Sequence, residues 1–581
     1  MMTAVRTALA AAVWMLAILS SSAPAQPMTP DSVLAPAIRA LDADERTIAR
    51  FHDDRWSRES IEARTALAQR ALAAWPPMPF DDLDVTARAD ALMLRAHLVG
   101  TLADLELAAA RRAEMLPLLP HRDLIEDLEA LRTQMAELDL PSLARELAAL
   151  PQMLRLVRER ITSAAETENP DAISVTPSLA LRAAGASAAS RRTLERFRDH
   201  YAAFVPAFGW HMDAPIREAL AAIGEHEKFL RESIAGQGGG DADALVGDPI
   251  GSEALLAHLE REMIALSPEE LIAVAETELA WCRARLAEAA GELGYGGDIA
   301  AAIDHVKSLH VAPGEQPALV TRLAREAIDF VRERNLVTVP ELCADLWRTQ
   351  MISARDQRTW PFAAYNNNHV MVAYASSEQD FEARQMAMRG NNEHFTRLVV
   401  QHELIPGHHL QGFMAARHRA YRSLFATPFF VEGWALYWEM LLWDVGFARG
   451  PEDRIGMLFW RSHRAARIIV SLKFHLGQMT PAEMTAFLVD QIHHERDNAA
   501  SEVRRYVGEQ YSPLYQVAYM IGGLQLRALA REVEAAGTMS QLEFHDELLR
   551  HGSIPVAMIR AQILGHDLSP AFTPDWRFDR D

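Results

Sequence analysis

Apolar residues recur at three- and four-residue spacing along most of the chain, beginning at about residue 30. This spacing places apolar side chains on one face of a helix, so it predicts helices through about residue 235. Thr176 followed by Pro177 is typical of a helix start. Further prolines are expected to divide this stretch into helices of ordinary length, at Pro117, Pro120, Pro141 and Pro151.

A glycine-rich segment interrupts the helical pattern at residues 236–251 (GQGGGDADALVGDPIG). Glycine and aspartate at this density are typical of a solvated loop. We place a domain boundary here, between an N-terminal helical region at 26–240 and a C-terminal region at 252–581. A loop that lines a cleft is the alternative. In the C-terminal region two capping boxes predict helix starts, at Ser267–Glu270 (with a helix through about Leu293) and at Thr480–Glu483.

The spacing changes between residues 336 and 376. LVTV (336–339) and HVMVAY (369–374) are rich in β-branched and apolar residues and are separated by proline and asparagines, which predicts two strands. A helix from about Asn392 is expected to follow and to run into a histidine cluster. The predicted fold class is therefore mainly α, with a small antiparallel sheet beside that helix.

The N-terminus has the layout of a secretory signal peptide over residues 1–25. Arg6 precedes an uncharged apolar run from Ala8 to Leu19, and Ala23-Pro24-Ala25 offers a cleavage site before Gln26. The run is short for a membrane span, so an uncleaved anchor is only the alternative. We therefore expect a periplasmic or secreted protein with no stable membrane insertion after cleavage.

Composition excludes some classes of function. The net charge is -21, and no basic stripe stands out against it, so binding to nucleic acid is not expected. The two cysteines, Cys282 and Cys343, either pair in an oxidising compartment or are buried free thiols. A metal site built on two cysteines is not expected.

The segment VVQHELIPGHHLQG, residues 399–412, concentrates metal-binding side chains in an apolar stretch. Imidazole is a common zinc ligand, which nominates His402 and His408. A glutamate that directly follows a ligand histidine lies beside the metal and can act as the base that deprotonates water, which nominates Glu403. A polar surface turn is the alternative interpretation of this segment.

A further ligand is expected on a neighbouring helix. FFVEGWALYWEMLLWD, residues 429–444, carries Glu432 among apolar residues, where an unpaired carboxylate would cost several kcal/mol. Glu432 is therefore expected to meet a cation. Glu439 lies two turns later and is a candidate to orient a ligand histidine, although a surface glutamate is an equal alternative.

The second histidine ligand is predicted to be His408 rather than His409. In a regular helix His408 lies about 240° round from His402, and His409 lies about 10 Å further along the axis. Neither position allows two bonds of about 2 Å to one ion. Pro406 and Gly407 are expected to break the regular winding and bring His408 into place.

His402-Glu403-x-x-Pro406-Gly407-His408-His409, followed by Val431-Glu432-Gly433-Trp434-Ala435, resembles the bacterial domain-of-unknown-function family 885. The resemblance covers residues from about 250 to 570 and includes Glu502-x-x-Arg505-Tyr506, Tyr519-x-x-Gly522, Phe544-His545-Asp546 and Gly552-x-x-Pro555. It implies a gluzincin-type relative of thimet oligopeptidase, angiotensin-converting enzyme and the Taq-type carboxypeptidases. The histidine spacing departs by two residues from the His-Glu-x-x-His of those enzymes.

That resemblance implies a large helical two-lobed body with a deep cleft, a zincin-like catalytic region at 252–581, and N-terminal helices that cover the cleft. It also implies that Glu432 is the third zinc ligand, that Tyr519 donates to an oxyanion, and that substrates are oligopeptides. Tyr515, one turn earlier, is an alternative donor or a substrate-binding residue. Simple packing is the alternative for both tyrosines.

Arginines beyond this segment are candidates for substrate binding. Arg504 and Arg505 could hold a substrate carboxylate, with a solvated helix face as the alternative, and we select Arg505. His493-His494-Glu495 lies between charged residues and is interpreted as a wet helix face rather than a metal site. The predicted strand 369–374 could bind a substrate backbone by adding a strand to the sheet.

The predicted function is hydrolysis of peptide bonds with one zinc ion, although cobalt or manganese would suit the same ligands. Glu403 would act as the general base. Two alternatives stay open: a non-catalytic periplasmic binding or scaffold protein with a peptidase-like fold, and a metal-dependent hydrolase of other amides or esters.

Overall fold

The computed structural model describes residues 29–163, 172–238, 245–358, 360–508 and 511–579. The predicted signal peptide at 1–25 lies outside these ranges. Most of the described residues are helical, which confirms the mainly α prediction. Within them, no helix combines the length and the apolar character that crossing a bilayer requires.

The first half of the chain forms helices in chain order. They are α2 (Ala35–Phe51), α3 (Arg58–Ala73), η1 (Phe80–Asp82), α4 (Val85–Met115), η2 (Leu116–Leu118), α5 (Arg122–Thr133), α6 (Leu140–Ser163), α7 (Pro177–Ala202), α8 (Phe208–Lys228) and the π-helical turn η3 (Phe229–Ile234). Thr176 caps α7 as predicted, through its side chain. Pro151 does not divide the chain: it lies inside α6, which continues past it.

The second half contains the remaining elements. They are α9 (Gly251–Arg261), α10 (Pro268–Glu292), α11 (Ile299–Ser308), α12 (Gln316–Glu333), α13 (Glu341–Asp345), β1 (Arg348–Met351), η4 (Asp356–Arg358), β2 (Ala363–Asn366), β3 (His369–Val372), α14 (Phe381–Gly390), α15 (Glu393–Glu403), α16 (His408–Ala415), η5 (Ala420–Phe425), α17 (Pro428–Asp444), α18 (Pro451–His475), α19 (Pro481–Ile492), α20 (Arg496–Val507), α21 (Tyr515–Ala536), α22 (Gln541–Arg550) and α23 (Val556–Leu564). The two predicted capping boxes are both formed, at the starts of α10 and α19.

The predicted sheet is present, but its topology differs from the prediction. Its strand order is β1-β3-β2, with β1 parallel and β2 antiparallel to β3, so the sheet is mixed rather than antiparallel. HVMV of the predicted strand 369–374 forms β3. LVTV (336–339) is not a strand, because other groups bind its backbone: Thr338 N–H donates to the Asp546 carboxylate at 3.0 Å, and the Leu336 carbonyl accepts from His545 Nδ1 at 2.6 Å.

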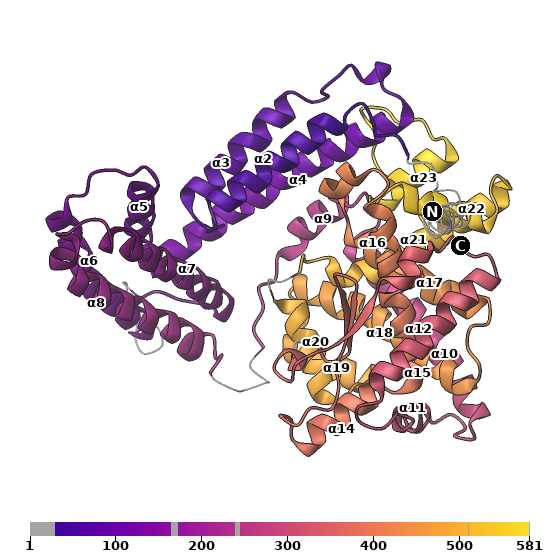
Figure 1. Cartoon of the computed structure of the whole chain (residues 1–581). Coiled ribbons are helices and arrows are strands. Elements are labelled where there is room, and N and C mark those ends of the chain that lie inside the picture. The colour runs from indigo at the N-terminus through magenta and orange to yellow at the C-terminus, as the bar shows by residue number, and fades with distance from the viewer. Residues whose placement is uncertain (1–28, 164–171, 239–244, 359, 509–510, 580–581) are drawn as a thin grey trace, which may run out of the picture.

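Helices α2, α3 and α4 lie side by side as an arm, and α5 to α8 gather at its far end, away from the body formed by the second half of the chain (Figure 1). The body end of the arm shares one hydrophobic core with the body, including Ile38 and Leu92. Helices α5 to α8 build separate cores, around Phe197 and Leu230. The division between cores therefore falls within α4, whereas the predicted regions 26–240 and 252–581 meet at the glycine-rich segment.

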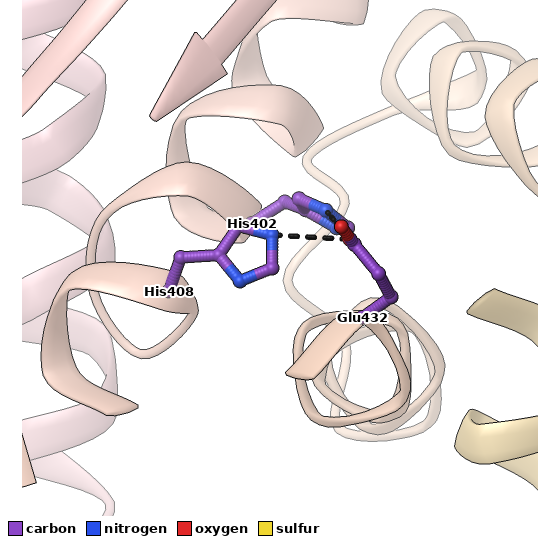
Figure 2. A group of neighbouring side chains, drawn as sticks. All are labelled: His402, His408 and Glu432. Atoms are coloured by element: carbon purple, nitrogen blue, oxygen red, sulfur yellow. Dashed lines mark ion pairs between the residues drawn. The ribbon is translucent and has the colours of Figure 1, made fainter. Parts of the chain in front are cut away.

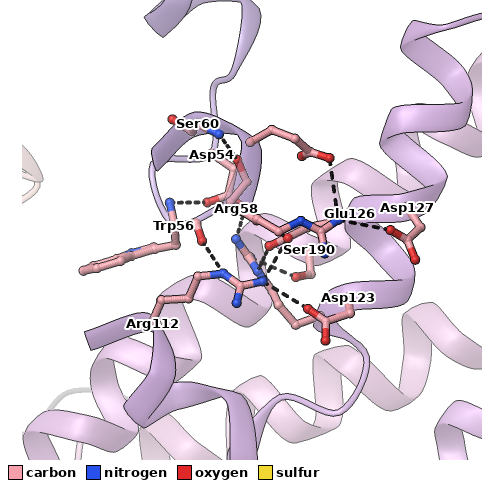
Figure 3. A network of polar contacts seen from close by, with 12 residues as sticks. Asp54, Trp56, Arg58, Ser60, Arg112, Asp123, Glu126, Asp127 and Ser190 are labelled. Atoms are coloured by element: carbon pink, nitrogen blue, oxygen red, sulfur yellow. Dashed lines mark hydrogen bonds and ion pairs between the residues drawn. The ribbon is translucent and has the colours of Figure 1, made fainter. Parts of the chain in front are cut away.

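Buried ion pairs fasten the arm at both ends. At the body, Asp90 of α4 accepts from Arg422 Nε of η5 at 2.8 Å and from the Tyr421 hydroxyl at 2.6 Å. At the far end, Glu126 of α5 accepts from Arg112 of α4 at 2.9 Å, within the polar network of Figure 3. Because these charges are paired, they can be buried at the junctions between the arm and its neighbours.

Cys282 and Cys343 are both buried and free, so they do not pair with each other. Burial raises the pKa of each thiol to about 12. Both therefore stay protonated and behave as small apolar side chains.

Candidate metal centre

Helix α15 carries the first candidate ligand on its last turn. The helix starts where the sequence predicted, and the side chain of Asn392 caps it. The inner face of α15 is buried along its length, as far as His402 and Glu403. The helix then stops, and α16 begins at His408. The predicted break at Pro406 and Gly407 is therefore present, as an interruption between two helices.

Gly407 is required for this break. A Cβ atom at this position would lie 1.8 Å from the His402 carbonyl oxygen, so no other residue fits without moving the backbone. Its N–H donates to the Gln401 carbonyl at 3.0 Å. The Pro406 carbonyl accepts from Trp434 Nε1 of α17 at 2.8 Å, which holds the break against the neighbouring helix.

His402, His408 and Glu432 converge on one point, as Figure 2 shows. Glu432 Oε2 lies 3.6 Å from His402 Nε2 and 3.2 Å from His408 Nε2, and one ligand atom from each of the three lies within 4.8 Å of the others. Two ligands bonded to a tetrahedral zinc at about 2.0–2.2 Å lie roughly 3.3–3.6 Å apart. The donors and their spacing therefore fit a divalent cation that takes nitrogen and oxygen ligands.

The electrostatics of this group favour a cation. Burial alone would raise the pKa of Glu432, but His408 and His402 hold it well below its ordinary value. Burial alone would lower the pKa of His402, but the neighbouring carboxylates of Glu432, at 3.6 Å, and Glu439, at 2.7 Å, raise it to about 9. Glu432 Oε2 is buried and has no hydrogen-bond partner among the described residues. A metal ion would take this position and displace the proton from His402.

Of the two alternatives that the sequence left open for Glu439, the structure supports the one in which it orients His402, because the side chain is buried. Its Oε1 lies 2.7 Å from His402 Nδ1, which leaves Nε2 directed at Glu432. Glu439 is also buried, and it follows Glu432 by two turns of α17. Its Oε1 also accepts from Arg464 Nη2 at 3.4 Å. This carboxylate–histidine pair is the arrangement that fixes the ring of a metal-ligating histidine.

We call His402, His408 and Glu432 together the metal group. Glu403 lies beside this group, and all four side chains line one pocket of about 590 Å³. Within the described part of the chain its carboxylate makes no hydrogen bond or ion pair, whereas Glu432 and Glu439 both have partners. Glu403 is therefore available to a ligand in the pocket.

Two tyrosines of α21 border the same group. The Tyr515 hydroxyl donates to Glu432 Oε1, which orients this carboxylate. The Tyr519 ring stacks on His402 with 6.1 Å between ring centroids and lines the pocket. Burial and the nearby Glu432 charge raise the pKa of both phenols, so both remain hydrogen-bond donors.

Of the two arginines that the sequence suggested for substrate binding, only one is among the residues that line the pocket, and two further arginines line it as well. Arg505 of α20 lines the pocket and pairs with Glu502, whereas Arg504 does not line it. Arg464 and Arg467 of α18 also line it, and sequence reasoning missed both. The signal available was the recurrence of arginine at three-residue spacing, at Arg461, Arg464 and Arg467.

Two expectations about neighbouring segments are corrected. The His493-His494-Glu495 segment is not a wet helix face: His494 is buried, follows α19, and pairs with His463 at 2.9 Å. Strand β3 is the central strand of the sheet and is paired on both sides, so it has no free edge for a substrate backbone. The edge strand β2 lines the pocket instead, through Ala363 to Asn366.

Comparison with solved structures finds the same fold in two bacterial proteins. One, from Shewanella oneidensis, is described as a "putative lipoprotein of unknown function"; it is 17% identical, with a TM-score of 0.66 over 91% of this chain and 98% of its own. The other, a "putative lipoprotein" from Colwellia psychrerythraea, is 15% identical, with a TM-score of 0.56 over 92% of this chain and 98% of its own.

A comparison with curated proteins finds no match. A family model described as a bacterial protein of unknown function, DUF885, matches residues 45–563. This range includes most of the arm, the metal group and the pocket. The chain therefore belongs to the DUF885 family of bacterial proteins.

Proposed function

We propose that this chain is a zinc-dependent peptidase whose metal ligands are His402, His408 and Glu432. The observation that carries the proposal is the convergence of these three side chains beside an unpaired glutamate at the head of an open pocket. Structural zinc sites have four protein ligands, whereas catalytic sites have three and keep a position open. The gluzincin-type relationship implied by the sequence resemblance is part of this proposal.

When bound, zinc supplies a Lewis acid that polarises a carbonyl group and makes water more acidic. Glu403 accepts the proton of the attacking water and delivers it to the leaving amine. The Tyr519 phenol donates to the oxygen on which negative charge develops. Glu439 holds the His402 ring, and Tyr515 holds the Glu432 carboxylate, so the ligands stay in place during the reaction.

Strand β2 supports a peptide as the substrate rather than another amide or an ester. It is an edge strand, and its residues line the pocket beside the metal group. An edge strand offers backbone N–H and C=O groups to an extended peptide. Hydrolysis of non-peptide amides or esters remains the alternative, and a parallel screen of short peptides, esters and acylated amines separates the two.

Export is also part of the proposal. Residues 1–25 have the layout of a signal peptide, and the two proteins of similar fold are each described as a "putative lipoprotein". Intact-mass measurement of the exported protein should give an N-terminus at Gln26. A soluble protein that still begins at Met1 contradicts it.

The decisive experiment measures bound metal and peptide hydrolysis on the same purified protein. Wild type should contain one zinc per chain and cleave members of a short-peptide library. Glu403→Gln should keep the zinc and lose at least about a hundredfold in turnover, the usual size of a general-base effect. Glu341→Gln, at a side chain that is 82% exposed, is the matched control and should retain both.

Two outcomes contradict the proposal. Equal loss of zinc and activity in Glu403→Gln makes this residue a ligand rather than a base. Zinc binding with no hydrolysis of any peptide, ester or amide by wild type favours a non-catalytic binding protein instead.

A further inference from the structure

Three arginines form one wall of the pocket, which we call the arginine wall: Arg464, Arg467 and Arg505. Arg464 and Arg467 are three residues apart on α18 and therefore share a face of that helix. Arg505 comes from α20. The side chains of Arg464 and Arg467 are only 7% and 4% exposed, so their charges are largely removed from water.

The arginine wall carries more positive charge than its neighbours balance. Three carboxylates line the described pocket, and two of them, Glu403 and Glu432, lie at the metal group. Only Glu502 lies at the wall, where it pairs with Arg467 at 2.8 Å and with Arg505. Arg464 has Glu439 at 3.4 Å, but Glu439 lies closer to His402, at 2.7 Å. The three guanidinium groups are therefore balanced by two carboxylates: Glu502, which two of the arginines share, and Glu439, which Arg464 shares with His402.

The wall also has unused hydrogen-bond donors. Three buried guanidinium nitrogens have no hydrogen-bond partner among the described residues: Arg464 Nε, Arg467 Nη1 and Arg505 Nε. Burying an unpaired charged donor is costly, so such groups are normally paired. A planar guanidinium matches a carboxylate better than it matches other groups, because two parallel N–H···O bonds can form.

The wall lies close to the metal group. The Tyr519 ring separates them: its centroid is 6.1 Å from that of His402, and it lies 4.4 Å from Arg467 Cζ and 4.9 Å from Arg464 Cζ. At roughly 3.3 Å per extended residue, these distances place the wall within about three residues of the metal group.

We propose that the arginine wall binds a carboxylate of the substrate, within about three residues of the bond that is cleaved. This inference rests on the proposed peptidase function and narrows its substrate class to peptides that are anionic near the cleaved bond. The carboxylate is either the C-terminus of a short peptide or the side chain of an aspartate or glutamate. A terminal carboxylate would make the enzyme cleave close to the C-terminus.

Matched peptides test the inference and separate the two sources. One pair differs only in a C-terminal carboxylate or amide, and another only in aspartate or asparagine one to three residues from the cleaved bond. For at least one pair, kcat/KM should be roughly ten- to hundredfold higher for the anionic member, mostly through KM, as for a charge-assisted hydrogen bond. Equal values within both pairs overturn the inference.

Variants then assign the preference to the wall. Arg505→Gln should bring the ratio of anionic to neutral kcat/KM towards one, and Arg505→Lys should give an intermediate ratio because lysine cannot bind bidentately. Arg504→Gln is the control, because this neighbour does not line the pocket, and it should keep the wild-type ratio. A purely structural role lowers both rates equally and leaves the ratio unchanged, which overturns the assignment. If Arg505→Gln does not fold, the ratio of anionic to neutral kcat/KM is measured on Arg505→Lys instead.

A binding measurement keeps this inference separate from the proposed reaction. Zinc-loaded Glu403→Gln protein is titrated in a calorimeter with an acetylated tripeptide as the free acid and as the amide. Tighter binding of the acid that disappears in the Arg505→Gln background supports the wall even if wild type cleaves nothing. Equal binding of acid and amide, together with the absence of an aspartate preference, overturns the wall even if peptides are cleaved.

Discussion

His408 and His409 are neighbours in the chain, yet their side chains have different partners. His408 Nε2 faces Glu432 at 3.2 Å, whereas the His409 ring lies 2.9 Å from both the Tyr365 hydroxyl and the Cys343 carbonyl. We expect His408→Ala to lose bound zinc and His409→Ala to keep it, because only His408 points at the ligand group. Metal analysis of both purified variants checks this. Zinc retained in His408→Ala and lost in His409→Ala would reverse the assignment.

Glu439 would act on a bound metal only through His402, so its removal should weaken zinc binding without abolishing it. Glu439→Gln should raise the zinc dissociation constant roughly 10–100-fold, the usual cost of losing a carboxylate that orients a ligand histidine. Competition against a chromogenic chelator measures this constant. The exposed Glu341→Gln variant serves again as the control. An unchanged constant in Glu439→Gln shows that the 2.7 Å contact does not support the metal.

At the scale of elements, the site depends on how closely α17 and α21 approach. A Cβ on Gly522 would lie 1.9 Å from the Phe429 carbonyl oxygen, and one on Gly433 would lie 2.6 Å from the Gly522 Cα. The two glycines therefore let the helices touch backbone to backbone. This contact places Tyr515 and Tyr519 of one helix against Glu432 of the other and His402 beside it.

Gly522→Ala should destabilise the protein by about 1–3 kcal/mol or more, because the added methyl group must push two backbones apart. Urea unfolding and zinc titration check this, and both stability and zinc affinity should fall. The control is Gly224→Ala in α8, where an added Cβ would have no atom within 4 Å. This change should stabilise the protein by about 0.5–1 kcal/mol, because alanine favours a helix more than glycine does. Similar stability of the two variants contradicts the close approach.

The sheet illustrates why the strands were only partly predictable. LVTV has the β-branched composition of a strand, but α22 supplies side-chain partners for its backbone, from His545 and Asp546. The chain forms β1 further on, at the mostly polar Arg348–Met351, because that segment lies alongside β3. Strand propensity reports fit to a pleated surface, so a segment without a neighbouring strand does not become one.

At the scale of the whole molecule, the arm formed by α2, α3 and α4 is tied to the body through Asp90 and Arg422, whose side chains are both fully buried. Asp90→Ala should cost about 3–5 kcal/mol, because it leaves Arg422 buried without its carboxylate. Urea unfolding followed by tryptophan fluorescence measures this. Asp44→Ala, at an exposed site on α2, should change stability by less than about 0.5 kcal/mol. Equal unfolding midpoints for the two variants contradict the role of the pair.

Local sequence determined much of this protein, because the responsible interactions are local. Side-chain caps at Thr176, Ser267, Asn392 and Thr480 start helices through bonds to their own first turns. Apolar spacing predicted the mainly α fold, and the residue types between 399 and 444 were enough to nominate a set of metal ligands. The caps and the apolar spacing need only residues a few positions apart in the chain.

Only the tertiary structure decided what depends on distant segments meeting. The approach of α15, α16 and α17 brings His402, His408 and Glu432 together, and it gives His409 other partners, Tyr365 and Cys343. The packing of α18 and α20 around the pocket assembles the arginine wall, because local spacing places Arg464 and Arg467 on one face of α18 but does not bring Arg505 to them. Strand pairing, the free state of both cysteines and the attachment of the arm likewise depend on contacts between segments that are distant in the chain. Such contacts form only once the whole chain has packed, because their partners have no fixed separation in sequence.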